Sequence, residues 1–391
     1  MVKSAAELMA DFAPVSGEQW LQQIHRDLKD RSSDDFIWSI PGGISADPFA
    51  HGYKSGEMPL PLSANAAEWQ IAERIAVGGV ETTHAQILAA LEGGAEVLCL
   101  DVDTDMDAEA FLGYTEGVHA DYIGWHFSGK GVERQPGAVF SCLESLCKER
   151  GLSASGLEGV LYWNPVRADK PDWRYVADLI EYAETCFPHF RIISLSADFH
   201  AGDPVFGLQQ ILSDAHTLLR ELTRKGISPE RVLHRVQLEI PVGKQYFVEI
   251  AKLRALHILW ANWLKSQALP LQWPFIRAVF APEAYDESLY TNMIRATTMA
   301  MSAVLGGARC LTVLPFNAVS AAEAAPKSLA FGRRIARNVQ HLLKMESHLN
   351  TLADPAAGSY YIEQLTRQIA QQVWEGLPST LFGDLKQQGN P

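Results

Sequence analysis

The chain has 391 residues, a formal net charge of −13 at pH 7 and a hydrophobic content of 47%. This length suits one large barrel with extensions or two ordinary domains, and the composition is that of a soluble globular protein. The acidic balance argues against binding to nucleic acid, although local basic groups leave room for a small anionic ligand.

The five cysteines contain no C-x-x-C pair. An odd number of thiols, most of them in apolar segments, favours reduced and buried side chains over a disulfide framework, so we expect a cytoplasmic protein. The first residues include Glu7 and Asp11 and lack the apolar core of a secretory signal. No apolar run is long enough to span a bilayer, and we expect no contact with a membrane.

Residues 1–65 are predicted to form an arm without a core of its own. Ser16 and Gln19 have the spacing of a capping box. Apolar residues then recur at helical spacing, namely Trp20, Leu21, Ile24 and Leu28. Residues 58–62 (Met-Pro-Leu-Pro-Leu) are expected to be extended, because proline excludes a helix there. Such an arm must lie on the rest of the chain or on a partner.

Apolar β-type runs alternate with helical stretches over residues 66–346. Strands are predicted at 71–77, 95–102, 121–127, 158–164, 190–199, 232–240, 273–280 and 309–315. Helical stretches are predicted between them at 82–92, 173–186, 207–224, 246–265 and 289–305. This alternation implies parallel strands joined by crossovers. Eight such units favour an α/β fold of the closed (β/α)8 TIM barrel type, with the open doubly wound sheet as the alternative.

Residues 347–391 are predicted to form a C-terminal extension or the start of a linker, with a helix over 362–374. Within the preceding helical frame, Glu346 and His348 are only two residues apart and face different ways. The sequence also lacks a Walker loop, a dinucleotide-binding glycine motif after a strand and an H-E-x-x-H motif. We therefore expect no metal site.

Polar side chains recur on one face of several predicted strands. Because successive side chains of a strand point to opposite faces, Ser194, Ser196 and Asp198 share one face of the fifth strand. Gln237 and Glu239 share one face of the sixth strand. The outer helices need the apolar faces, so these polar faces should point to the barrel axis. An ordinary barrel fills its axis with Val, Ile and Leu, so the pattern predicts a hollow, solvated or ligand-filled axis for a long polar ligand.

Active sites of such barrels lie at the C-terminal ends of the strands. The polar residues expected there are Asp103, His126, Asn164, Asp198, His200, Glu239 and Arg277. The alternative is a centre without a ligand, in which Arg235, Glu239 and Arg277 pair across the axis, because buried charges need partners. His200 either donates a hydrogen bond to a carbonyl or is a solvated loop residue.

The same pattern predicts an axial cavity whose lining consists of Ser194, Ser196, Gln237 and Thr312. Large side chains that fill this cavity would indicate that ligand binding has been lost.

Several segments carry a longer sequence pattern. They are Phe247-Val-Glu-Ile-Ala-Lys-Leu-Arg254, Leu259-Trp260-Ala261, Arg334-Ile-Ala-Arg-Asn338, Glu346-Ser-His348 and Asp354-Pro-Ala-Ala-Gly-Ser-Tyr-Tyr-Ile-Glu363. In content and order they resemble the methylmalonyl-CoA mutase family, and the start at Ala67-Glu-Trp-Gln-Ile71 fits as well. The resemblance covers nearly the whole chain and matches the barrel half of the family. It implies a barrel that binds an acyl-CoA along its axis and is capped by a second domain that holds adenosylcobalamin.

The chain departs from the catalytic pattern of that family. Its nearest string to the cobalt-ligating D-x-H-x-x-G motif, Asp214-Ala-His216-Thr-Leu-Leu219, lacks the glycine and lies in a predicted helix. Arg74 stands where catalytic chains have a substrate-contacting tyrosine, and Ser196-Ala-Asp-Phe-His200 stands in place of Ser-Gly-Tyr-His. The eighth strand ends as Thr312-Val-Leu-Pro-Phe-Asn317 without His-Thr-Asn. These changes make the chain most similar to the small, non-catalytic subunit of two-chain mutases.

The first interpretation is therefore a supporting barrel subunit, inactive alone, whose larger partner supplies adenosylcobalamin. The second is an active substrate-binding half whose cobalamin domain is separate or trimmed, and the third is an acyl-CoA-binding protein without a mutase role. The residues expected to contact an acyl-CoA are Arg74, His126, Asn164, Ser194, Ser196, Asp198, Gln237, Glu239, Arg277 and Thr312. No metal ligand is assigned, and His200 is the sole candidate for a catalytic role.

Overall fold

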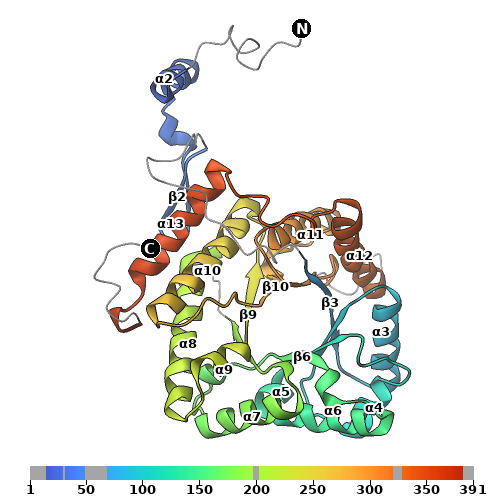
Figure 1. The fold of residues 1–391 in the computed structure, drawn as a ribbon. Coiled ribbons are helices and arrows are strands. Elements are labelled where there is room, and N and C mark those ends of the chain that lie inside the picture. The colour runs from blue at the N-terminus through green and yellow to red at the C-terminus, as the bar shows by residue number, and fades with distance from the viewer. Residues whose placement is uncertain (1–14, 30, 49–67, 197–201, 320–327, 382–391) are drawn as a thin grey trace, which may run out of the picture.

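In the computed structural model, which describes residues 15–29, 31–48, 68–196, 202–319 and 328–381, a parallel sheet forms a barrel ringed by helices (Figure 1). The strands of this sheet are β3 (Gln70–Ala76), β4 (Val97–Asp101), β5 (Gly124–Ser128), β6 (Glu158–Leu161), β7 (His189–Arg191), β8 (Ile193–Ser196), β9 (Val236–Val242), β10 (Ile276–Phe280) and β11 (Cys310–Thr312). Their order in the sheet is β7-β6-β5-β4-β3-β11-β10-β9-β8.

The sheet closes on itself because β7 and β8 are two parts of one strand, separated only by Ile192. The first part pairs with β6 and the second pairs with β9. In addition, the backbone N–H of Ser194 donates to the carbonyl of Trp163, just beyond β6, at 2.9 Å. Both ends of the sheet thus meet in one stretch of chain, and the predicted TIM-type barrel with eight strand positions is confirmed over the open sheet.

The helices of the ring are α3 (Val80–Glu92), α4 (Ala108–Tyr114), α5 (Lys130–Arg134), α6 (Pro136–Arg150), α7 (Trp173–Cys186), α8 (Pro204–Arg224), α9 (Pro229–His234), α10 (Tyr246–Ser266), α11 (Leu289–Leu305) and α12 (Leu329–His341). Short 3-10 turns lie at Ser33–Phe36, Ala154–Gly156, Pro165–Arg167, Pro282–Ala284 and Ser379–Leu381, and a π-helical turn lies at Leu342–Glu346. Among the helices of the described residues, none combines the length and the apolar character that crossing a membrane requires.

Several predicted strands begin too early, among them 273–280, whose observed counterpart β10 starts at Ile276. Residues 232–234, expected to start the sixth strand, belong to α9, because Pro229 at the first helical position favours a helix there. Residues 121–123 precede β5 rather than opening it, and Tyr122 is exposed in a turn. The apolar content of these two segments does not reveal where the strand starts, because a short apolar run is compatible with more than one local structure.

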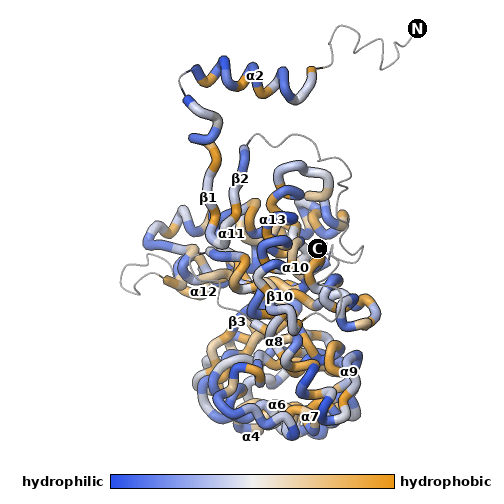
Figure 2. Tube along the Cα trace, turned by 90° about the vertical axis from the view of Figure 1, so that its left-hand side faces the viewer, coloured by the Kyte–Doolittle hydropathy of each residue, from blue (hydrophilic) through white to orange (hydrophobic). Residues whose placement is uncertain are grey.

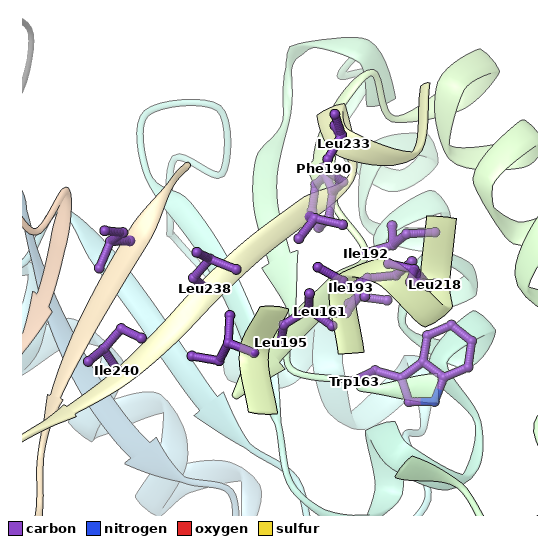
Figure 3. Packing of buried hydrophobic residues seen from close by; sticks show 14 of the residues in the cluster. Leu161, Trp163, Phe190, Ile192, Ile193, Leu195, Leu218, Leu233, Leu238 and Ile240 are labelled. Carbon is purple, nitrogen blue, oxygen red and sulfur yellow. The ribbon is translucent and has the colours of Figure 1, made fainter. Parts of the chain in front are cut away.

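The outer faces of the strands pack beneath the helices as predicted. Ile193 and Leu195 of β8 and Leu238 of β9 are fully buried in the main core, together with Leu218 of α8 (Figure 3). Burial of each such side chain contributes about 1.5–3 kcal/mol of stabilisation. This packing fixes which face of each strand is left to line the axis.

The N-terminal region consists of two parts with different surroundings. Helix α2 (Gly17–Leu28) projects away from the barrel (Figures 1 and 2), has no buried residue and begins with the predicted capping box. Strands β1 (Trp38–Ile40) and β2 (Ile44–Ala46) form an antiparallel hairpin. This hairpin packs on α13 (Tyr360–Gly376), where the N–H of Ser45 donates to Gln368 Oε1 at 3.1 Å.

The described part of the C-terminal extension packs on the barrel rather than leaving it. Helix α13 lies against α10 and α8. The fully buried guanidinium of Arg254 on α10 pairs with Asp354 at 2.9 Å and with Glu363 at 2.8 Å. The segment that resembles the mutase family in residues 354–363 therefore includes the anchor that holds this extension in place.

Candidate functional site

A cavity of about 910 Å³ opens at the C-terminal ends of the barrel strands. We call it the mouth cavity. The predicted residues that line it are Arg74, Asp103, Asn164, Ser194, Ser196, Glu239, Arg277 and Thr312. His126 and Gln237 are buried below it, whereas Asp198 and His200 lie outside the described residues. The strand alternation thus brings most of the predicted residues together.

The floor of the mouth cavity centres on Arg277, whose side chain is 5% exposed. Its Nη2 donates to Thr312 Oγ1 at 3.0 Å, and its Nη1 donates to the carboxylate of Glu239. The guanidinium also lies 4.2 Å from the centre of the Tyr162 ring, a cation–π contact. These contacts satisfy the buried charge within the chain, so they match the predicted pairing of Glu239 with Arg277.

His126 and Tyr162 continue this network inside the barrel. His126 Nδ1 and the hydroxyl of Tyr162 are 2.5 Å apart. Burial and the nearby guanidinium of Arg277 lower the pKa of His126 well below its ordinary value, and burial raises the pKa of Tyr162. Both side chains are therefore neutral at pH 7, and the tyrosine hydroxyl can donate to an unprotonated imidazole nitrogen.

Gln237 and Ser194 complete the layer of side chains across the axis. Gln237 Nε2 donates to Ser194 Oγ at 2.6 Å, and Ser194 Oγ donates to the carbonyl of Leu161 at 2.9 Å. Gln237 is fully buried. Cys99 Sγ lies 3.8 Å from His126 Nδ1 and accepts from Arg277 Nη2 at 3.5 Å. We call Cys99, His126, Tyr162, Gln237 and Arg277 the central layer.

The predicted axial cavity is confirmed in part, because Ser194, Ser196 and Thr312 line the mouth cavity whereas Gln237 does not. A second cavity of about 120 Å³ lies at the N-terminal end of the barrel, with Arg191, Phe275 and Arg309 in its lining, and it shares no residue with the mouth cavity. Strand alternation correctly showed which side chains face the axis. It could not show that the long side chains of Tyr162 and Arg277 contact each other there.

The alternative of a charge-paired axis included Arg235, and this part of the alternative is wrong. Its Nη1 donates to the carbonyls of Pro188 at 2.8 Å and Phe190 at 2.9 Å, at the N-terminal end of the barrel. Because Arg235 follows the last residue of α9, it precedes β9 instead of belonging to it. Among the described residues, the axial ion pair consists of Glu239 and Arg277.

Charged side chains on the rim of the mouth cavity are paired with neighbours. Arg74 pairs with Asp101, and Arg167 pairs with Asp214 at 2.9 Å. Asn164 Nδ2 also donates to Asp214, at 3.0 Å. Asp214 belongs to α8, and its carboxylate is occupied by these contacts at the barrel rim. It is therefore a helical residue and not part of a loop that could hold a cofactor.

Several residues of this site were not predicted from the sequence. Tyr162 and Cys99 fall within predicted strands, and counting every second residue back from Asn164 or forward from Val97 would have placed both on the inner face. Arg333 and Arg337 line the mouth cavity from α12. Their helix is distant in sequence from the strands, and no local signal connects them with the site.

Neither a metal site nor a cobalt-ligating histidine is found in the described part of the chain. No group of three or more His, Cys, Asp or Glu residues there is arranged to hold a metal ion. The lining of the mouth cavity contains no histidine. His216 lies within α8, and burial lowers its pKa. The described residues therefore do not fit the role of an axial cobalamin ligand.

Comparison with known proteins agrees with this architecture. Residues 163–380 match the family model described as methylmalonyl-CoA mutase. A methylmalonyl-CoA mutase small subunit from Porphyromonas gingivalis is 28% identical and aligns with 96% of this chain and 64% of its own length. The methylmalonyl-CoA mutase small subunit from Streptomyces virginiae is 27% identical and aligns with 94% of this chain and 64% of its own length. The large subunit from that organism is 26% identical and aligns with 94% of this chain and 57% of its own length.

This chain thus spans about two thirds or less of the length of these relatives. The matched residues include the segments at 247–254, 334–338 and 354–363 in which the resemblance was recognised. The family model covers more than half of the chain, and the relatives cover nearly all of it. The chain therefore belongs to the methylmalonyl-CoA mutase family.

Proposed function

We propose that this chain is the supporting barrel subunit of an adenosylcobalamin-dependent methylmalonyl-CoA mutase, an enzyme that interconverts methylmalonyl-CoA and succinyl-CoA. Side chains cannot generate the radical that this isomerisation needs, so the cofactor must supply it. In the proposed complex a larger partner chain holds the cofactor and performs the reaction. The present chain stabilises the assembly.

The observation that carries this proposal is the central layer. An acyl-CoA that follows the barrel axis must pass the level of Tyr162, Gln237 and Arg277, and their side chains occupy it. The Nη1 and Nη2 atoms of Arg277 are paired with Glu239 and Thr312. Interior charges that pair with each other need no charged substrate to balance them.

The arm supports the same proposal. Helix α2 has an apolar face, yet none of its residues is buried in the described structure. Leu21 is 36% exposed on this helix. An amphipathic helix gains most of its stability from packing its apolar face, so α2 is suited to lie on a partner chain.

The first experiment asks whether a larger chain copurifies with the full-length protein. We expect the tagged chain to copurify with a mutase large subunit whose absorption spectrum shows a bound corrinoid. We expect Leu21→Asp to weaken that association and to leave the melting temperature of the isolated chain unchanged. Ser141→Asp, on the exposed side of α6, is the control and should retain the partner. A stable monomer without affinity for any cobalamin-bearing chain contradicts the proposal.

The second experiment separates a supporting barrel from an active one. The chain alone should not isomerise methylmalonyl-CoA when adenosylcobalamin is added, whereas the assembled complex should. His200→Ala should change turnover of that complex by less than about twofold, like the control His189→Ala at the exposed start of β7. Collapse of turnover in His200→Ala, with the complex intact, would make this chain the active half.

Acyl-CoA binding without a mutase role is the second candidate, favoured by the polar lining of the mouth cavity. Its residues Arg74, Asn164, Ser194, Ser196, Glu239, Arg277 and Thr312, with His126 and Gln237 below and Asp198 outside the described residues, remain proposed contacts. Titration of the isolated chain with acyl-CoA esters tests it. Binding below millimolar concentration, with no effect of a mutase partner, would favour this candidate over the first.

A further inference from the structure

The side of the mouth cavity next to α12 holds a buried group of charges that the proposed subunit role does not use. Glu73 belongs to the outward-facing set of β3 and is only 6% exposed. It accepts hydrogen bonds from Arg333 Nε at 2.5 Å and from Arg337 Nη1. Arg333 Nη1 also donates to Gln86 Oε1 at 2.6 Å. We call Glu73, Arg333, Arg337 and Gln340 the α12 cluster.

The α12 cluster carries one positive charge in excess. Two guanidinium groups share one carboxylate, and Glu73 is the sole acidic residue within ion-pair distance of either arginine among the described residues. The three side chains are between 7% and 13% exposed. A buried charge is costly unless it is paired. The cluster would therefore be stabilised by a second anion.

The atoms that lack partners point to where this anion would bind. Arg333 Nη2 and Gln340 Oε1 are buried and have no hydrogen-bond partner among the described residues. Both side chains line the mouth cavity, and Gln340 is 99% buried. Residues 333, 337 and 340 follow each other at intervals of four and three, so they share one face of α12.

Arg337 contributes charge rather than a direct contact. Its Nε also lacks a partner, but a β-carbon on Gly93 would lie only 2.4 Å from that nitrogen. The guanidinium thus packs against the Gly93 backbone, which leaves no space for a ligand on that side. A ligand in the cavity is left with a donor from Arg333 and an acceptor from Gln340.

We propose that the α12 cluster binds inorganic phosphate in the mouth cavity, because both forms of that anion near pH 7 keep at least one hydroxyl group. Phosphate oxygens accept from Arg333 Nη2, and a protonated phosphate hydroxyl donates to Gln340 Oε1. An ionised carboxylate accepts hydrogen bonds but has none to donate, so it satisfies only the first of these groups. This inference is independent of the subunit role, because it concerns a different wall of the cavity and can be tested without a partner chain.

The test is isothermal titration of the full chain with inorganic phosphate at constant ionic strength, with malonate as the carboxylate probe. We expect saturable binding of phosphate and weaker binding of malonate. Arg333→Gln should weaken phosphate binding by roughly 10- to 100-fold, the effect of losing one charge-assisted hydrogen bond. Arg334→Gln is the matched control, because its guanidinium instead lies 5.1 Å from the Phe331 ring, and it should bind as the wild type does.

A second variant gives an expected change of opposite sign. Glu73→Gln raises the net charge of the cluster from one to two, so it should bind phosphate more tightly even though it removes a buried ion pair. A purely structural cluster predicts a loss of stability without any gain in affinity. The inference is overturned if wild-type protein shows no saturable binding, if Arg333→Gln and Arg334→Gln behave alike, or if malonate binds as tightly as phosphate. Circular dichroism verifies folding, and Glu73→Gln remains decisive should Arg333→Gln unfold.

Discussion

At the scale of single residues, burial keeps His257 neutral. His257 on α10 is 2% exposed and lies edge-to-face with Trp273 at 5.7 Å. Burial lowers its pKa to about 4, from 6.5 in a solvated chain. The unfolded protein therefore takes up a proton at pH values where the folded protein does not, and acid must favour unfolding.

The first prediction concerns this histidine. Because its folded pKa lies below its unfolded pKa, its contribution is lost as the pH falls from about 6.5 towards 4, and about 2 kcal/mol should be gone at pH 5. Urea unfolding at pH 7.5 and pH 5 measures the difference. His257→Asn should reduce that pH difference by about the same amount, whereas the exposed His189→Asn should leave it unchanged. An equal pH difference in wild type and His257→Asn would assign the acid sensitivity to other groups.

The second prediction concerns the pair in the central layer. Glu239→Ala leaves the guanidinium of Arg277 buried without its carboxylate, which should cost about 3–5 kcal/mol of stability. Arg277→Met should cost less, because the carboxylate of Glu239 is 24% exposed and can be hydrated. The double variant should recover part of the loss. Urea unfolding of the four proteins measures the coupling, and additive effects would show that the pair is not energetically linked.

At the scale of elements, Arg254 joins three separate segments. It donates to Asp354 and Glu363 and also contacts Thr366 Oγ1 at 3.2 Å. Asp354 has a φ of 44°, an unusual backbone conformation for a residue other than glycine, and the ion pair helps to hold it there. The segment that precedes α13 is thus fixed to α10 by one guanidinium.

The third prediction follows from this arrangement. Arg254→Met should leave two buried carboxylates unpaired, lower the stability by about 3–5 kcal/mol and speed hydrogen exchange in α13 more than in the barrel strands. Arg220→Met provides the control, because its pair with Glu221 is solvent-exposed and should contribute little to stability. Uniform exchange across α13 and the strands would mean that the extension does not open independently.

At the scale of the whole molecule, the N-terminal region divides between the barrel and the surroundings. The hairpin of β1 and β2 buries Ile40 and Ile44 against the body, and Trp38 Nε1 donates to the hydroxyl of Tyr361 at 3.2 Å. Helix α2 lies beyond this hairpin and away from the body (Figure 2). The predicted boundary between arm and barrel near residue 65 stays a prediction, but the hairpin packs with the barrel.

The fourth prediction uses two truncations to separate these parts. A chain that starts at residue 37 lacks α2 and should unfold at the same urea concentration as the full chain. A chain that starts at residue 47 also lacks the hairpin and should lose about 3 kcal/mol, because two isoleucines no longer bury their side chains. If the chain that starts at residue 37 is already as unstable as the chain that starts at residue 47, then α2 contributes to the stability of the isolated protein.

Periodicity was sufficient to predict the barrel. The alternation of Ser194 and Ser196 with Ile193 and Leu195 identified the inner face of one strand, and the repeat of strand and helix identified the closed sheet. Long segments of family-like sequence predicted the relationship that the comparisons then established. These features depend on neighbours along the chain, so the amino-acid sequence alone determined them.

The filling of the axis was decided only by the tertiary structure. Whether Tyr162 and Arg277 contact each other depends on the diameter of the barrel and on the direction of long side chains, which periodicity does not contain. The same holds for Arg235, which bonds to carbonyls at the opposite end, and for Arg333 and Arg337, which reach Glu73 across about 260 residues of sequence. The local sequence determines which face of a strand a side chain points to. Its neighbours across the barrel are determined only when the sheet closes, because closure brings residues that are distant in sequence into the same interior.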